Sequence, residues 1–224
     1  MAESDFTPSR VFIHGAGRRG TAAWPHIAPD AGEFLSFSPE STVEEQVARL
    51  AKRVVTGHTI IYAHSIGAVP AVLAAVQRKP AALVLVEPAL YDIARGDAAI
   101  ERHIAVVTEA RAQAAAGDLR AFWAIQRPLM FGGPIDFAEW ERERPVAEHW
   151  ASTNVPWGHG VRRGMLRDVP TLIVTGGWNE EYETIAAALA DDGAQHTVLP
   201  GAQHRPMDLA EFLPTVLAFE ESIG

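Results

Sequence analysis

Ser65 stands in a five-residue pattern that is typical of a serine nucleophile. Small residues, Ala63 and Gly67, lie two positions before and after it. An apolar run, residues 59–62, precedes the pattern without a linker, and a stretch of helical composition, residues 68–76, follows it. A tight strand-to-helix corner needs small residues at these two positions, and it lifts the hydroxyl clear of the strand end. The alternative is that Ser65 only caps the helix, but the strand, turn and helix context favours the nucleophile.

A nucleophilic serine needs a general base, because its hydroxyl is weak at neutral pH until an imidazole takes the proton. His204 is the candidate base. It lies in a loop between the last apolar run, residues 196–200, and a terminal helical stretch that begins near Pro206. The alternative for His204 is a histidine that only caps this helix.

These patterns resemble the α/β-hydrolase family, whose nucleophile turn is usually Gly-x-Ser-x-Gly. In this chain Ala63 takes the place of the first glycine. The resemblance implies that the amides of Ile66 and Ala16 form an oxyanion hole and that His204 is the general base. It also implies that the loop containing His14 and Gly15 lies against the substrate, as glycines permit a close approach of the backbone.

The acid of the expected triad is the point where this sequence departs from the family pattern. The family usually has an aspartate a few residues after the penultimate strand, where this chain has Asn179. An amide can orient an imidazole, but it does not stabilise imidazolium by charge. Glu87, at the end of the apolar run 81–86, and Glu180 are the two substitutes, with Glu183 a weaker third. We favour Glu87 because a strand end is held more firmly than a loop.

Residues 15–20 also fit the G-x-G-x-x-G fingerprint of a dinucleotide site. That site needs a helix after the glycines and an acidic residue about 20 positions further on. Pro25 would interrupt the helix after about one turn, and the expected strand 34–37 ends in Ser38-Pro39-Glu40, which displaces the acid. We therefore expect no dinucleotide and no other cofactor.

Buried apolar runs and helical stretches alternate along much of the chain, which predicts an α/β fold. The resemblance implies about six mostly parallel strands in a doubly wound sheet. In the connection before the nucleophile strand, residues 41–44 predict a capping box for a helix over residues 43–54. The strands are expected in six segments: residues 9–13, 34–37, 59–62, 81–86, 170–176 and 196–200.

Residues 89–168 break this rhythm, and the resemblance implies that they form a helical cap on a core of residues 1–88 and 169–224. Helices are expected over residues 98–116 and 119–126, followed by a region rich in proline, glycine and aromatic residues. We expect most of these aromatics to pack the cap, and a few to face the substrate. Trp123 in the cap, and Trp178 after it, are the candidates for substrate contact.

Composition excludes several classes of function. The net charge of −9 disfavours a nucleic-acid or anionic membrane surface, and no run approaches the ~18 apolar residues of a membrane span. The absence of cysteine excludes thiolate catalysis, and the histidines at 103, 149 and 159 lack metal-ligand spacing. The N-terminus lacks the apolar segment of a signal peptide, so a cytoplasmic location is expected.

The favoured function is a serine hydrolase of small, largely apolar carboxylic esters, which acts through an acyl-enzyme without metal or cofactor. One alternative is a cofactor-free lyase or carbon–carbon bond hydrolase with the same triad. Another is a ligand-binding pseudo-hydrolase that lost turnover with Asn179 in the acid position. The expected partner is a small-molecule ester, with a homodimer as an open alternative.

Overall fold

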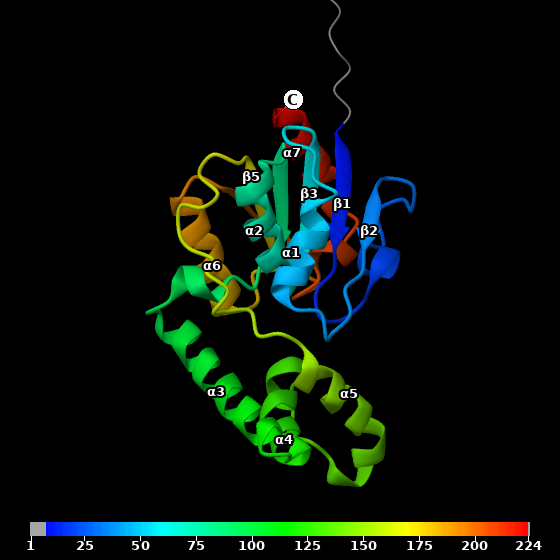
Figure 1. Cartoon of the computed structure of the whole chain (residues 1–224), viewed down its shortest axis with the longest axis vertical. Helices are drawn as coiled ribbons and strands as arrows, with labels where there is room; N and C mark the ends of the chain where they lie inside the picture. Colours follow the sequence, from blue (N-terminus) through cyan, green and yellow to red (C-terminus); the bar gives the residue numbers. More distant parts are fainter. Residues whose placement is uncertain (1–7, 224) are drawn as a thin grey trace, which may run out of the picture. The chain divides into compact units, whose positions relative to one another are not determined.

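The computed structural model describes residues 8–223 and contains a parallel sheet of six strands (Figure 1). The strand order is β2-β1-β3-β4-β5-β6, and every neighbouring pair is parallel. The bounds are β1 Ser9–Ile13, β2 Glu33–Leu35, β3 Thr59–His64, β4 Ala82–Val86, β5 Thr171–Thr175 and β6 Gln195–Val198. The chain reverses its direction across the sheet between β1 and β3, and open α/β sheets bind ligands at the carboxyl ends beside such a point.

Helices and short 3-10 turns connect the strands. The 3-10 elements are η1 Gly20–Ala23, η2 Ser65–Gly67, η3 Tyr91–Ala94, η4 Phe137–Glu139 and η5 Pro206–Asp208. The α-helices of the described chain are α1 Val43–Ala51, α2 Ala68–Arg78, α3 Ala98–Ala115, α4 Leu119–Phe131, α5 Trp140–Ser152, α6 Glu180–Asp191 and α7 Phe212–Ile223.

The sheet is buried on both faces, which explains why its central strands are apolar without alternation. On one face, Phe12 and Tyr62 share a core cluster with Phe212 and Val216 of α7. Helices α1 and α2 lie on the opposite face (Figure 1). The predicted α/β class with a doubly wound sheet is confirmed.

The helix before β3 has a capping box, but one residue later than predicted. The Thr42 hydroxyl accepts the Glu45 amide, and the Glu45 carboxylate accepts the Thr42 amide. The prediction of residues 41–44 was therefore wrong by one position. Ser41 and Thr42 are both good N-cap types, and so are glutamates at 44 and 45 for the third helical position, so composition could not choose between two overlapping boxes.

Two helix starts beside the site also differ from the expected ones. Helix α6 begins at Glu180, earlier than residue 183, because the Asn179 side chain accepts the Glu181 amide and acts as the N-cap. Helix α7 begins at Phe212, because residues 206–208 form the separate 3-10 turn η5. The loop that contains His204 is thus followed by a tight turn before the helix.

The chain forms two compact units. One contains residues 1–94 and 155–224, and the other contains residues 95–154. The second unit lies within the segment predicted to be the cap. Its core contains Phe122, Trp123 and Trp140.

The second unit is more helical than its sequence suggested. Helix α4 continues past the expected end at residue 126, through Pro128 to Phe131, and α5 contains Pro145, in the region rich in proline and glycine where no helix was predicted. Proline removes one helical N–H but its φ angle is compatible with a helix. Proline frequency alone was therefore a poor guide to where these helices end.

The described residues form neither a membrane-spanning helix nor the helix of a dinucleotide site. None of the helices over residues 8–223 is long and apolar enough to cross a membrane. After Gly17 the chain forms the 3-10 turn η1, not the helix that a dinucleotide fingerprint would require.

Candidate active site

Ser65 lies at a tight corner between β3 and α2. Its φ angle is +53°, in the left-handed region that non-glycine residues rarely adopt. A Cβ atom added to Gly67 would lie 2.6 Å from the carbonyl oxygen of His14, so a side chain at position 67 would collide with the end of β1. Ala63 is fully buried within the sheet. The strained corner predicted from the sequence pattern is confirmed.

Glu87, directly after β4, is a fully buried carboxylate that accepts hydrogen bonds from three directions. The amide of Gly176 donates to Oε1 at 2.6 Å. The indole Nε1 of Trp178 and the imidazole Nδ1 of His204 contact Oε2 at 3.1 Å and 3.2 Å. These partners hold the carboxylate in one orientation, as a buried charge requires.

The contact with Glu87 fixes the state of the His204 ring. A carboxylate only accepts hydrogen bonds, so Nδ1 of His204 must carry the hydrogen. In the neutral imidazole, Nε2 is then left with its lone pair, which is the state that a general base needs. The contact therefore orients the imidazole and also supplies the negative charge that the amide of Asn179 could not supply.

Ser65 and His204 meet at a common neighbour, Tyr182 of α6. Burial raises the pKa of Tyr182, and the nearby side chain of Ser65 opposes this shift. The ring centroid of Tyr182 lies 4.9 Å from that of His204. Two residues distant in the sequence thus lie around one side chain at the carboxyl edge of the sheet.

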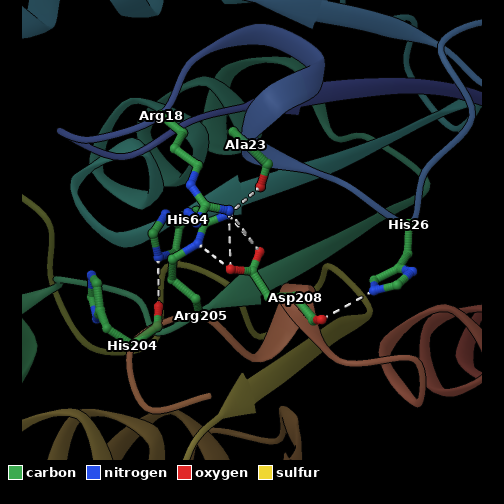
Figure 2. A network of polar contacts seen from close by, with 7 residues as sticks. All are labelled: Arg18, Ala23, His26, His64, His204, Arg205 and Asp208. Atoms are coloured by element: carbon green, nitrogen blue, oxygen red, sulfur yellow. Dashed lines mark hydrogen bonds and ion pairs between the residues drawn. The ribbon is translucent and has the colours of Figure 1, made fainter.

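His64, the residue before Ser65, holds the loop that contains His204. Its Nε2 lies 2.9 Å from the carbonyl oxygen of His204 and therefore donates to it (Figure 2). The side chain is buried, and burial lowers the pKa of His64 well below its ordinary value. A neutral imidazole in the nucleophile turn thus positions the backbone of the candidate base.

An ion-pair network ties the same loop to the rest of the fold (Figure 2). Arg205 donates to both carboxylate oxygens of Asp208 and to the carbonyl oxygen of Ala23. Arg18, from the loop after β1, also donates to Asp208, at 3.1 Å. The Arg205 guanidinium, followed by Arg18, lowers the pKa of Asp208. The network joins the loop around His204 to the loop that follows β1.

The loop after β1 lies against the nucleophile. A Cβ atom added to Gly15 would lie 3.0 Å from the Cβ atom of Ser65 and 2.9 Å from Nδ1 of His64. Ala16 follows in this loop, and Ile66 is the second residue of η2, where the first N–H groups of a helical turn have no acceptor within it. The loop and the turn thus flank Ser65, as two oxyanion donors would.

His14 was a candidate for substrate contact, but both of its ring nitrogens contact the protein backbone. Its Nε2 accepts the Phe37 amide at 3.1 Å, so Nδ1 carries the hydrogen and donates to the carbonyl oxygen of Gly15. The side chain is buried, and burial lowers the pKa of His14. His14 therefore holds the loop after β1 in position, and any effect of His14 on the site is transmitted through this loop.

Asn179 and the other two acidic candidates lie at the start of α6 and have other surroundings. Asn179 caps the helix, Glu180 is exposed in its first turn, and Glu183 accepts the Gly177 amide at 3.1 Å. The Nδ1 atom of His204 instead contacts Glu87.

The two tryptophans predicted to contact substrate have different surroundings. Trp178 is 43% exposed, and its ring lies edge-on to His204, at 6.2 Å between centroids. Trp123 is 1% exposed in the core of its own unit, where its Nε1 donates to Glu143. Only Trp178 therefore combines exposure with contact to the candidate triad. In residues 8–223, no group of three or more histidine, aspartate or glutamate side chains is arranged to hold a metal ion.

The family profile of the alpha/beta hydrolases matches residues 11–213 of the sequence. The chain belongs to this family. The match covers both compact units, so this alpha/beta hydrolase has its second unit as an insertion in the sheet domain.

Solved structures share the fold of this alpha/beta hydrolase at low sequence identity. It is similar to a carboxylesterase of the thaumarchaeon Nitrososphaera gargenis, with 14% identity, a TM-score of 0.60 and coverage of 99% of this chain and 93% of the other. It is also similar to MenH from S. aureus, with 16% identity, 99% and 96% coverage and a TM-score of 0.61. NosK from Streptomyces actuosus gives 16% identity, 97% and 99% coverage and a TM-score of 0.58. A comparison with curated proteins yields no match.

Sequence reasoning missed two residues that contact the candidate triad of this alpha/beta hydrolase. His64 occupies a variable position of the nucleophile pattern, and the pattern predicts neither a residue type nor a role at this position. Tyr182 lies in an ordinary helical turn beside Glu181 and Glu183. A histidine directly before the serine was the one signal that could have been followed; nothing in the sequence around Tyr182 pointed to the site.

Two buried neutral histidines predict that this alpha/beta hydrolase loses stability in mild acid. The pKa values of His14 and His64 are lowered in the folded chain, so below the unfolded value of about 6.5 the unfolded state binds more protons. Stability is therefore retained above pH 6.5 and falls as the pH decreases below it. Each histidine contributes a slope of up to about 1.4 kcal/mol per pH unit.

Urea unfolding of wild type and His64→Gln between pH 5 and 8 measures this effect. Glutamine keeps a side-chain N–H donor but does not titrate, so the variant should have the shallower slope between pH 6 and pH 5. Near pH 8 the two slopes should coincide. Equal slopes at both ends of the range would contradict the buried neutral state of His64.

Proposed function

We propose that the chain is a serine hydrolase that cleaves small, largely apolar carboxylic esters through an acyl-enzyme. The observation that carries the proposal is the contact of 3.2 Å between Nδ1 of His204 and the buried Glu87, beside a serine in a strained nucleophile turn. Membership of the alpha/beta hydrolase family supports the same chemistry.

In the proposed mechanism, Nε2 of His204 takes the proton of the Ser65 hydroxyl as Oγ attacks the ester carbonyl. The negative charge of Glu87 stabilises the imidazolium that forms. The amides of Ile66 and Ala16 are proposed to donate to the oxyanion of the tetrahedral intermediate. His204 then protonates the leaving alcohol, and a water activated by the same imidazole deacylates Ser65.

The surroundings of Ser65 support an ester of largely apolar groups. Ile66, Trp178 and Tyr182 are each partly or well exposed around the triad, and their side chains are apolar over most of their surface. The net charge of −9 also disfavours anionic substrates through electrostatic repulsion.

A fluorophosphonate probe tests the nucleophile directly. The wild-type protein should be labelled and Ser65→Ala should not, because the probe phosphonylates only an activated serine hydroxyl. Ser222→Ala, which removes a hydroxyl from α7, is the matched control and should be labelled like wild type. Labelling of Ser65→Ala, or a silent wild type, would contradict the proposal.

Product analysis separates ester hydrolysis from the reactions that use the same three side chains. Wild type should release acid and alcohol from p-nitrophenyl and ethyl esters of short acids. Cleavage of β-diketones or cyanohydrins in place of these esters would indicate carbon–carbon bond hydrolysis or a lyase. Ligand-induced thermal stabilisation with no turnover and no labelling would indicate a pseudo-hydrolase.

A further inference from the structure

The candidate acid Glu87 has a second donor on the same oxygen that contacts the candidate base. Oε2 of Glu87 lies 3.2 Å from Nδ1 of His204 and accepts the indole N–H of Trp178 at 3.1 Å. The other oxygen, Oε1, accepts the amide of Gly176 at 2.6 Å. A carboxylate oxygen has two lone pairs, so the indole and the imidazole together use the acceptor capacity of Oε2.

Trp178 comes from the loop after β5, where the family usually has its acid. In this chain Asn179 caps α6, and the residue before it reaches a carboxylate at the end of β4 instead. Two glycines precede the tryptophan. A Cβ atom at Gly176 would lie 3.0 Å from Cδ1 of the indole, and Gly177 has a φ angle of +66°, which favours glycine. These two residues allow the indole to lie back against its own loop.

The two rings that donate to Oε2 separate the carboxylate from solvent. Glu87 is fully buried, whereas Trp178 is 43% exposed and the side chain of His204 is 32% exposed. Water therefore has no access to Oε2 while both rings are in place. Removal of the indole N–H with the ring retained would leave a lone pair of a buried charge without a donor, which is unfavourable.

The indole differs from the imidazole because it keeps the same hydrogen throughout the proposed reaction. A tryptophan side chain is a donor only and does not titrate. His204 gains and loses a proton at Nε2, and its charge changes at each step. The terminal torsion of a glutamate side chain has a broad energy minimum, and Gly176 holds only Oε1. A constant donor on Oε2 keeps this oxygen directed at Nδ1 while the charge of the imidazole changes.

We propose that Trp178 is a positioning residue of the triad, which acts through the hydrogen bond from its indole N–H to Oε2 of Glu87. The inference rests on the proposed function and adds a fourth side chain on which turnover depends. It differs from a role in substrate contact, because it requires the N–H group and not only the apolar ring.

The test removes the N–H group of Trp178 in two ways. Trp178→Phe keeps an aromatic ring, and a second variant replaces Trp178 with 3-benzothienylalanine, in which sulfur takes the place of the N–H and the ring keeps its shape. In both variants kcat for p-nitrophenyl butyrate should fall by about tenfold, the size of one hydrogen bond to a charged group. KM should stay within about twofold of wild type, because loss of an interaction needed only in the transition state lowers kcat and kcat/KM equally.

Trp24 provides a matched control in the same compact unit. Its side chain is 1% exposed in the core cluster on one face of the sheet, and within the described chain its Nε1 has no hydrogen-bond partner. The same analogue at position 24 removes an N–H group without the loss of a hydrogen bond, so kcat should stay at the wild-type value. Melting temperatures show whether each protein is folded.

Three outcomes would overturn the role of Trp178. A raised KM with unchanged kcat would make Trp178 a substrate contact only. A slow Trp178→Phe beside a benzothienylalanine variant as fast as wild type would assign the effect to the size of the ring. Wild-type kcat and KM in both variants would show that the other donors hold Glu87 without the indole.

The fluorophosphonate probe separates this inference from the proposed function. A wild type that is labelled and cleaves esters, together with any of these three outcomes, would overturn the positioning role alone. A wild type that is neither labelled nor active would overturn the proposed function and the positioning role with it. A tenfold lower kcat in both variants at unchanged KM, with the variant at position 24 like wild type, would support the proposal.

Discussion

Glu87→Gln should lower kcat for ester cleavage by about 10⁴-fold, the cost seen when a triad carboxylate becomes an amide. The reason lies in the partners of Glu87, which are hydrogen donors from Gly176, Trp178 and His204. A glutamine offers one oxygen and one NH₂ group, so at least one of these donors would face another donor. If His204 turns its Nδ1 into an acceptor to adapt, Nε2 gains the hydrogen and ceases to be a base.

The measurement is the rate of p-nitrophenyl butyrate hydrolysis by wild type, Glu87→Gln and Glu180→Gln, with melting temperatures to confirm that each is folded. Glu180→Gln should keep at least a third of the wild-type kcat, because the Glu180 carboxylate is exposed and Nδ1 of His204 contacts Glu87 instead. A slow Glu180→Gln with a nearly normal Glu87→Gln would instead assign the acid to Glu180.

Gly176→Ala should impair both stability and activity. A Cβ atom at this position would lie 2.1 Å from the carbonyl oxygen and 2.9 Å from the carbonyl carbon of Gln203. Both contacts are with the backbone, which has no flexible side-chain end to move aside. Gln203 already has a φ angle of +48° and directly precedes His204, so relief of the clash must displace the candidate base.

We expect the free energy of unfolding to fall by about 3 kcal/mol in Gly176→Ala, within the range for overpacked buried sites. The value of kcat/KM should fall by about 100-fold, since a displacement of 1 Å can cost that much. Urea unfolding and ester kinetics measure the two effects. Gly17→Ala is the control for stability, because its Cβ atom would meet nothing within 4 Å. A Gly176→Ala protein as stable and active as wild type would show that the loop has room to move.

The positions of backbone strain also distinguish the site from the rest of the sheet domain. Among the non-glycine residues of the described chain, four have positive φ angles, and three of them are Ser65, Glu87 and Gln203. They are the candidate nucleophile, the candidate acid and the residue before the candidate base. Strain of this kind persists where the surrounding structure over-determines the backbone, which is typical of functional sites.

The sequence by itself determined the parts that depend on local chemistry. Apolar runs without alternation predicted strands buried on both faces, and the small residues around Ser65 predicted the tight corner. Both depend on steric contacts between neighbouring residues and on burial. A short segment of sequence contains the information needed to predict them. The position of Glu87 at the end of a central strand also made it a better candidate than Glu180, on grounds of rigidity alone.

Only the tertiary structure decided which side chains meet. The contact of Glu87 with His204, the hydrogen bond from His64 to the His204 carbonyl and the ring contact of Tyr182 with His204 each join segments that are distant in the sequence. Such contacts depend on strand order and on where each loop returns to the sheet edge. Residue type and spacing do not encode strand order or the path of each loop. The structure was therefore needed to show that Asn179 caps a helix and that Tyr182 is a neighbour of Ser65.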